Sequence, residues 1–146
     1  MKKLLFIFTI MMVSMSVYAQ KQQVYYKSTG TNVNVRKGPG KNYAVETLNG
    51  GAHCGSGKAQ LVKEEIVISD GKQRNGFIHV YPAGEPCWEE GWVSAQYLTR
   101  ATKCSACNGR GNTGRKCPEC NGQGVYACCH YSGKELCPKC WGIGYR

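Results

Sequence analysis

The sequence has no stretch with a sustained helical repeat of apolar residues and, beyond its first twenty residues, no apolar run long enough to cross a membrane. It also has no phosphate-binding loop, no nucleophile motif and no visible general acid–base pair. The three histidines, His53, His79 and His130, have no catalytic sequence context. These absences argue against a helical bundle, against a membrane-spanning domain in the mature chain, and against an enzyme.

The first residues have the pattern of a secretory signal peptide. Lys2 and Lys3 precede an uncharged, mostly apolar stretch over 4–17, and Val17 and Ala19 stand at the −3 and −1 positions of a cleavage site. The apolar stretch of 14 residues is shorter than the roughly 20 that a spanning helix needs. We therefore expect residues 1–19 to be removed and the protein to be exported to the periplasm, the cell surface or the medium. An uncleaved membrane anchor is the alternative.

Aliphatic residues become scarce after about Thr102, and this divides the chain. Residues 20–100 contain two cysteines and most of the valine, isoleucine and leucine, whereas residues 101–146 contain eight cysteines. A segment so poor in apolar side chains cannot offset its chain entropy by burial alone and needs a metal or disulfides. The composition therefore predicts two small domains, 20–100 and 101–146.

Acidic residues are also few, nine against nineteen lysines and arginines, which gives a formal net charge of +10. The basic residues are spread along the chain without a block of like charge, as on an ordinary solvated surface. A basic exported protein would still be attracted to anionic polymers of the cell envelope. Nucleic acid is not expected as a partner outside the cell.

Short alternating segments separated by turn residues fill the first domain. Alternation would direct Val33 and Val35 inward, with Asn34 and Arg36 outward. Five or six short strands in about 80 residues predict an all-β fold, a small closed barrel that hides its edge strands. Strands are expected at 24–26, 33–35, 44–48, 66–68, 77–80 and 91–93, and turns at 38–40, 49–51, 70–71 and 75–76.

The segments NVNVRKGPGKNYAVETL (32–48) and GWVSAQYLT (91–99) resemble the opening and closing segments of a bacterial SH3-like (SH3b) domain. The resemblance implies a module that binds cell-wall peptidoglycan or peptides. We expect Trp92 to pack inside the barrel. Four residues are candidates for exposed ligand contacts, and for each an ordinary surface or rim position is the alternative: Tyr25, Arg36, Tyr43 and Trp88.

The segment between these two ends is longer than the SH3b pattern and contains Cys54 and Cys87, the only cysteines of the first domain. An oxidising compartment favours a disulfide between them. Such a bridge would close a loop of about 33 residues and contribute roughly 3–4 kcal/mol on the chain-entropy model. A metal site shared with the C-terminal domain is the alternative.

Three segments of the C-terminal domain repeat the pattern C-x-x-C-x-G-x-G: CSACNGRG (104–111), CPECNGQG (117–124) and CPKCWGIG (137–144). In a C-x-x-C turn both thiolates converge on one face and can bind one tetrahedral zinc ion, so two turns make a site. The glycine two positions after the second cysteine lets backbone N–H groups approach the sulfurs and offset their charge. The repeats therefore predict zinc held by paired turns.

The repeats resemble the cysteine-rich zinc domain of DnaJ-type chaperones, in which four repeats pair first with fourth and second with third. Here the expected third repeat is replaced by YACCHYSG (126–133), in which two cysteines are adjacent and cannot easily both face one ion. About two zinc ions are expected, the second less well defined. The resemblance implies one ion on Cys104, Cys107, Cys137 and Cys140, and another on Cys117, Cys120 and two ligands from Cys128, Cys129 and His130.

Aromatic and apolar residues of the C-terminal domain have two interpretations. They form either an apolar face for a protein partner or the only core that this small domain has. The residues are Tyr126, Tyr131, Trp141, Ile143 and Tyr145.

Disulfides are the alternative to zinc, because eight cysteines in an oxidising compartment allow four bridges in 105 arrangements. A bridge within a C-x-x-C turn adds little loop-closure stabilisation, whereas structural zinc contributes folding energy directly. The chain has no His-Pro-Asp motif, so an Hsp70-type partner is not implied. We expect a non-enzymatic exported binding protein whose tail is a platform for protein contact. A periplasmic thiol–disulfide or chaperone-like factor is the alternative.

Overall fold

The computed structural model describes residues 23–50, 54–84, 86–123, 130 and 132–146. The predicted signal peptide, the cysteine pair Cys128 and Cys129, and Tyr126 and Tyr131 lie outside the described residues. Within the described part the fold is all-β, as predicted. All of its strand pairs are antiparallel, and its only helical element is one turn of 3-10 helix, Ala95–Tyr97.

The strands of the N-terminal part are short, and a long connection separates the second from the third. They are β1 (Val24–Ser28), β2 (Val33–Asn34), β3 (Gln60–Leu61), β4 (Ile66–Ser69), β5 (Gln73–Arg74), β6 (Phe77–Pro82), β7 (Gly91–Ser94) and β8 (Leu98–Arg100). The C-terminal part contains β9 (Asn112–Lys116) and β10 (Lys134–Leu136).

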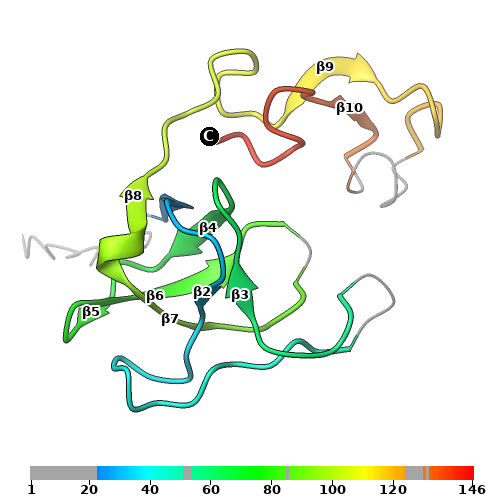
Figure 1. Ribbon diagram of the computed structural model, residues 1–146. Coiled ribbons are helices and arrows are strands. Elements are labelled where there is room, and N and C mark those ends of the chain that lie inside the picture. Colours follow the sequence, from blue (N-terminus) through cyan, green and yellow to red (C-terminus); the bar gives the residue numbers. More distant parts are fainter. Residues whose placement is uncertain (1–22, 51–53, 85, 124–129, 131) are drawn as a thin grey trace, which may run out of the picture.

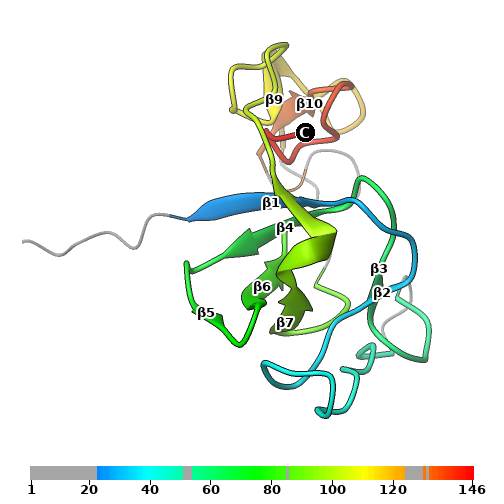
Figure 2. The same ribbon diagram turned by 60° about the vertical axis from the view of Figure 1, so that its left-hand side comes forward.

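Most strands of the barrel belong to one sheet, in the order β5-β6-β4-β1-β8, with β7 also paired to β6. The strands β2 and β3 form a separate pair. Arg36, just after β2, connects the two groups because its N–H donates to the carbonyl of Trp92 in β7 (2.9 Å), and the Trp92 N–H donates back (2.7 Å). The strands therefore wrap around a common interior (Figures 1 and 2).

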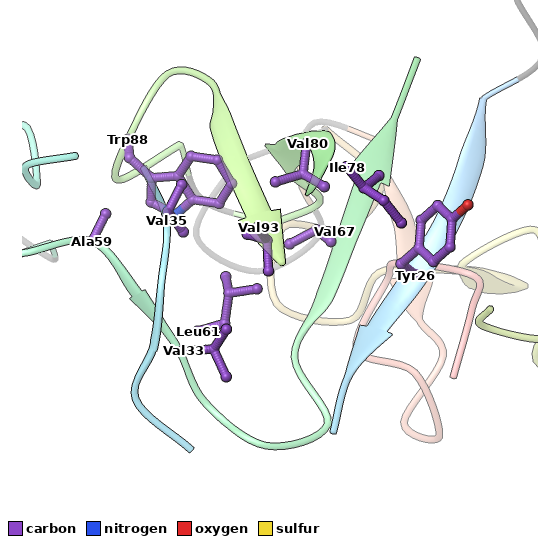
Figure 3. Close-up of a cluster of buried hydrophobic side chains, with 10 residues drawn as sticks. All are labelled: Tyr26, Val33, Val35, Ala59, Leu61, Val67, Ile78, Val80, Trp88 and Val93. Carbon is purple, nitrogen blue, oxygen red and sulfur yellow. The ribbon is translucent and has the colours of Figure 1, made fainter. Parts of the chain in front are cut away.

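The interior of the barrel is a single apolar cluster (Figure 3). Val33 and Val35 are buried and Asn34 and Arg36 are partly exposed, which confirms the alternation expected for this segment. Each fully buried valine or leucine contributes about 1.5–3 kcal/mol relative to an exposed position. The cluster consists of Tyr26, Val33, Val35, Ala59, Leu61, Val67, Ile78, Val80, Trp88 and Val93.

The turn between β5 and β6 shows how local sequence sets the register of the sheet. Asn75 and Gly76 both have positive φ, 51° and 76°, and the flanking residues Arg74 and Phe77 are paired. Two central residues with positive φ make a type I′ turn, whose twist matches that of an antiparallel hairpin. The predicted turn at 75–76 is therefore present, and Ile78, two residues after it, belongs to the buried cluster of the interior.

The C-terminal part is fastened to the barrel through β1 and the segment that follows β8. The N–H of Ala101 donates to the carbonyl of Tyr25 (2.9 Å), and Thr102 and Arg146 exchange backbone hydrogen bonds of 2.8 and 2.9 Å. The rings of Tyr25 and Tyr145 stack with centroids 3.7 Å apart and planes 7° from parallel. In Figure 2 the C-terminal part, with β9 and β10, lies above β1.

Candidate metal centre

The first and last C-x-x-C turns lie against each other and bring four thiols together. Cys104 and Cys107 come from the turn before β9, and Cys137 and Cys140 from the turn after β10. The Sγ atoms of Cys104 and Cys137 are 3.9 Å apart, those of Cys107 and Cys140 are 3.7 Å apart, and all four lie within 4.8 Å of one another. None of the four is in a disulfide, and all are buried.

These separations fit a tetrahedral metal site. Four sulfurs at about 2.3 Å from a central zinc ion would be about 3.8 Å from one another along the edges of the tetrahedron. The two closest sulfur pairs, at 3.9 and 3.7 Å, match this edge. The predicted group Cys104, Cys107, Cys137 and Cys140 is therefore confirmed as one that could hold a metal ion and is compatible with zinc.

Backbone N–H groups support the sulfurs, as the glycine spacing predicts. The N–H of Gly111 donates to Cys107 Sγ and that of Gly144 to Cys140 Sγ, both at 3.3 Å. Hydrogen bonds of this kind stabilise the thiolate that a metal needs. The two hydrogen bonds are equivalent in the two repeats, because each glycine stands four residues after the cysteine that accepts from it.

The two turns are also paired through the backbone in a reciprocal way. The N–H of Cys104 donates to the carbonyl of Gly144 (2.8 Å), and that of Cys137 donates to Gly111 (2.9 Å). Gly111 lies so close to Gly142 that a Cβ on Gly111 would overlap the Gly142 carbonyl oxygen. The last glycine of the repeat thus serves the contact between turns as well as the turn itself.

The residue after the second cysteine adopts a left-handed conformation in each described repeat. Its φ is 51° at Asn108, 49° at Asn121 and 50° at Trp141. Asparagine tolerates this region, whereas for a bulky residue such as tryptophan it is an outlier with a cost of about 1–2 kcal/mol. Trp141 also has 74% of its surface exposed. The last repeat therefore carries an aromatic side chain in solvent at some cost to the turn.

The thiols of the cluster are chemically unequal without a metal. Burial raises the pKa of Cys107, but hydrogen bonds from the Gly111 N–H and from the neighbouring thiols outweigh it and lower the pKa to about 7. Burial raises the pKa of Cys140 to about 12. Cys107 is nevertheless only 2% exposed, and a thiol that reacts with a partner must be accessible as well as ionised. Four buried thiols with no open position are typical of a structural metal site.

The second C-x-x-C turn has the same local arrangement as the first. Cys117 and Cys120 are buried, and the N–H of Cys117 donates to the carbonyl of Gly133 (3.0 Å), as Cys104 does to Gly144. His130 has a φ of 47°. The predicted ligands Cys128 and Cys129 lie outside the described residues, so the second zinc site stays a prediction.

The two cysteines of the barrel are joined to each other. Cys54 and Cys87 form the predicted disulfide, across a sequence separation of 33 residues. Their sulfurs are therefore not part of a metal site shared with the C-terminal part. The bridge lies next to Trp88, and Asn49 further ties this region down because its N–H donates to the carbonyl of Cys87 (2.8 Å).

Neither of the two tryptophans Trp88 and Trp92 has the burial expected for it. The expectation that Trp88 is exposed is wrong: only 4% of its surface is exposed, and its indole lies in the core beside Val35 and Val93 (Figure 3). Trp92 is half-buried instead of packed in the interior. Its neighbours Gly91 and Val93 point inward, so alternation along β7 directs Trp92 to the other face.

The other three candidate contacts of the barrel do not form one surface group. Tyr25 is half-buried under Tyr145. The guanidinium of Arg36 donates to the carbonyl of Tyr43 (2.7 Å), and Tyr43 is 44% exposed. The ring of Tyr43 covers Gly38, where a Cβ would overlap it, so this glycine is required by close approach. The contact of Tyr25 with the C-terminal part could not have been inferred from either segment alone.

Sequence reasoning missed the polar cluster around His79 in β6. This histidine is buried between Asp70, 3.3 Å from its Nδ1, and Glu90, 3.7 Å from its Nε2. The available signal was a histidine within the otherwise apolar strand segment 77–80.

The comparisons with known proteins find no counterpart. The chain matches no protein-family model, no curated protein and no solved structure. Among the described residues, no helix is both long and apolar enough to span a membrane. The resemblances to SH3b and DnaJ-type cysteine-rich domains therefore rest on the motifs of the sequence.

Proposed function

We propose that this chain is a non-enzymatic exported binding protein. In this proposal an SH3b-type barrel docks on cell-wall peptidoglycan or on a peptide ligand. The C-terminal part, held by zinc, is a rigid platform for contact with another envelope protein. Zinc is expected on Cys104, Cys107, Cys137 and Cys140, with a second ion on the group that includes Cys117 and Cys120.

The observation that carries the proposal is the closed character of the four-cysteine group. Its thiols are buried, and sulfur–sulfur distances of 3.7 and 3.9 Å match the edges of a tetrahedral site whose four positions are all taken by cysteine. Such a site supplies folding energy rather than chemistry. The hydrogen bond from Ala101 to Tyr25 and the stacked rings of Tyr25 and Tyr145 support a platform with a fixed position on the barrel.

Export is supported by the disulfide between Cys54 and Cys87, because disulfides persist in oxidising compartments. The positive charge of the chain is suited to an anionic envelope. Both observations are compatible with export. The signal peptide at 1–19 itself is assigned from the sequence pattern alone.

The alternative function, a thiol–disulfide factor, is favoured by one observation, the pKa of about 7 at Cys107. A thiol with this pKa is partly ionised at neutral pH and could attack a disulfide. Its burial argues against this role. The two functions therefore differ in whether Cys107 reacts in the folded protein.

The deciding experiment is a metal analysis and a thiol count on the mature protein isolated from its native compartment. About two zinc ions per chain, with C-terminal thiols that react only after chelation and unfolding, would support the proposal. A metal-free protein with a rapidly reacting thiol would support the thiol–disulfide factor. Retention on purified peptidoglycan, or its absence, tests the docking role of the barrel separately.

A further inference from the structure

A cavity of about 400 Å³ opens on the barrel beside β6 and β7. The segment 88–92 forms one side, the segment 46–49 another, and His79 reaches it from β6. We call it the acidic pocket, and its principal lining residues are Glu46, His79, Trp88, Glu89, Glu90 and Trp92.

The charge of the acidic pocket is opposite to that of the chain as a whole. Three glutamates line it against one cation, Lys37, whose Nζ is already 3.7 Å from Glu46 and whose side chain is 55% exposed. The chain carries a net charge of +10. Burial and then the negative charges of Asp70 and Glu90 raise the pKa of Tyr81 at the edge of this region. The pocket is thus a negative depression on a positive molecule.

His79 turns its second ring nitrogen toward the pocket. Burial would raise the pKa of Asp70, but interactions with Lys72 and His79 outweigh it and lower the pKa to about 2, so this carboxylate is ionised and only accepts hydrogen bonds. The Nδ1 of His79, 3.3 Å away, therefore carries the proton. The other ring nitrogen, Nε2, faces Glu90 Oε2 at 3.7 Å, beyond hydrogen-bond distance, and when the ring is neutral this nitrogen accepts hydrogen bonds.

An aromatic wall completes the pocket. The ring of Trp92 lies 4.9 Å from that of His79, tilted by 46°, and Trp88 lines the pocket from the core. A tryptophan face attracts a cation electrostatically and also packs against an alkyl chain. Carboxylates, a histidine nitrogen and an indole together favour a ligand that is cationic, donates hydrogen bonds and has an apolar stem.

The walls are held rigidly, so little entropy is lost on binding. Trp92 and Arg36 exchange two backbone hydrogen bonds, and a Cβ on Gly91 would overlap Val35. Asn49 binds the carbonyl of Pro86 (2.6 Å) through its amide, beside the disulfide of Cys87. A preformed site of this kind loses less of its interaction energy to ordering.

We infer that the acidic pocket binds a primary ammonium group on the alkyl side chain of a peptide. This inference rests on the proposed function of the barrel as a binding module and specifies what that module recognises. The ammonium would lie between Glu90 Oε2 and His79 Nε2, with its alkyl stem against Trp92. Two sources supply this chemistry, a lysine side chain in a protein and a free side-chain amine in a peptidoglycan stem peptide.

The test is titration of the full mature chain, with its disulfide intact, followed by amide NMR shifts. The probes are Ala-Lys-Ala, the same peptide with an acetylated side-chain amine, and a muramyl peptide with a free side-chain amine. Ligands of this size are expected to bind with dissociation constants of about 1 mM. The free amines should shift residues of the pocket, and the acetylated peptide should bind at least about tenfold more weakly.

Two matched variants locate the effect. Glu90→Gln removes one pocket charge and should weaken binding of the free amine about fivefold to tenfold. Glu64→Gln is the same substitution on the barrel but outside the pocket, where the side chain pairs with Lys27, and it should bind as the parent does. Thermal unfolding of both variants checks that the barrel is intact.

Equal binding of the acetylated and free peptides, no binding of either free amine, or an unchanged affinity in Glu90→Gln would overturn the inference. Binding of only one free amine would support it and identify the source. Retention on peptidoglycan that Glu90→Gln leaves unchanged, together with no binding of either free amine, would overturn the pocket while the docking function stands. Binding of Ala-Lys-Ala by a protein that purified peptidoglycan does not retain would support the pocket and exclude peptidoglycan as its ligand.

Discussion

The barrel buries ten hydrophobic side chains in one cluster, whereas the largest buried cluster among the described residues of the C-terminal part consists of four cysteines. The stability of the barrel is therefore distributed over many contacts, each worth a few kcal/mol. In the C-terminal part the proposed metal would supply most of the stability, so the loss of one cysteine ligand should remove most of it. The comparison predicts that a single substitution lowers the free energy of unfolding of the barrel by part of its value, whereas the loss of one metal ligand unfolds the C-terminal part.

The largest effect is expected from Cys137→Ser. With three thiols left, the first site should lose its metal and with it most of about 10 kcal/mol of metal-linked folding energy, while the barrel stays folded. Metal content and amide NMR spectra of the two parts would check this. Lys139→Ser, at an exposed position in the same turn, is the control and should keep the metal. Equal metal content in both variants would contradict the assignment of Cys137.

Trp88→Ala should produce the largest effect of a single substitution in the barrel. Truncation of a buried tryptophan lowers the free energy of unfolding by about 3–5 kcal/mol. Trp92→Ala removes an equal number of atoms from a half-buried position and should cost clearly less. Denaturant unfolding of the two variants measures the difference. A larger loss of stability in Trp92→Ala than in Trp88→Ala would mean that Trp92, and not Trp88, is the main aromatic residue of the core.

Replacement of Cys54 and Cys87 by serine should lower the free energy of unfolding of the barrel by about 3–4 kcal/mol, because a loop constraint is removed from the unfolded chain. The metal content of the C-terminal part should not change, since neither sulfur belongs to the four-cysteine group. A fall in bound metal would show that the two parts share ligands.

The contact between the parts should show as a coupling of about 1 kcal/mol between Tyr25 and Tyr145, the usual worth of a stacked aromatic pair beyond its buried area. A double-mutant cycle with alanine at either or both positions isolates this energy. Additive effects would mean that the ring contact adds nothing to the backbone hydrogen bond from Ala101 to Tyr25 in holding the two parts together.

The smallest effect, and the only gain, is expected from Trp141→Asn. Asparagine occupies the equivalent left-handed position in the first and second repeats, so the substitution should stabilise the metal-bound fold by about 1 kcal/mol. Trp141→Ala removes the ring without supplying a residue suited to this conformation and serves as the control. Chelator-induced unfolding compares the two, and equal effects would show that the backbone at 141 is not strained.

Alternation of side chains predicted the longer strands of the barrel because burial on one face imposes a period of two. It identified β1, β4, β6 and β7 within a few residues. The two-residue strands β3 and β5 were missed, since so short a segment has no period to detect. The expected strand at 44–48 contains only isolated bridges, at Val45 and Thr47.

The positions of the two tryptophans could be predicted only in part. Trp92 follows an inward glycine and precedes an inward valine, so alternation already assigns it to the outer face. Trp88 stands in a loop, where no period applies, and it enters the core because the neighbouring disulfide and Asn49 hold that loop against the barrel. Long-range constraints of this kind are not encoded in the local pattern.

The four-cysteine group was predicted completely, because the ligand spacing of a metal turn is set by its geometry and repeats in the sequence. The pairing of the first turn with the last came from the resemblance to a known family. The cluster of Asp70, His79 and Glu90 was not predicted, since its three residues come from separate segments that only the sheet brings together.

The backbone and ring contacts between the C-terminal part and the barrel fix the position of one relative to the other. This affects how tightly a partner that contacts both parts can bind. Two modules on a loose linker can search for separate targets, and their gain from joint binding falls as the linker lengthens. Here Ala101 and Thr102 are already paired with Tyr25 and Arg146, so the spacing of the two surfaces is fixed in advance. A partner whose two epitopes match that spacing would be held far more tightly than either surface alone allows, and a mismatched one would gain nothing from the second.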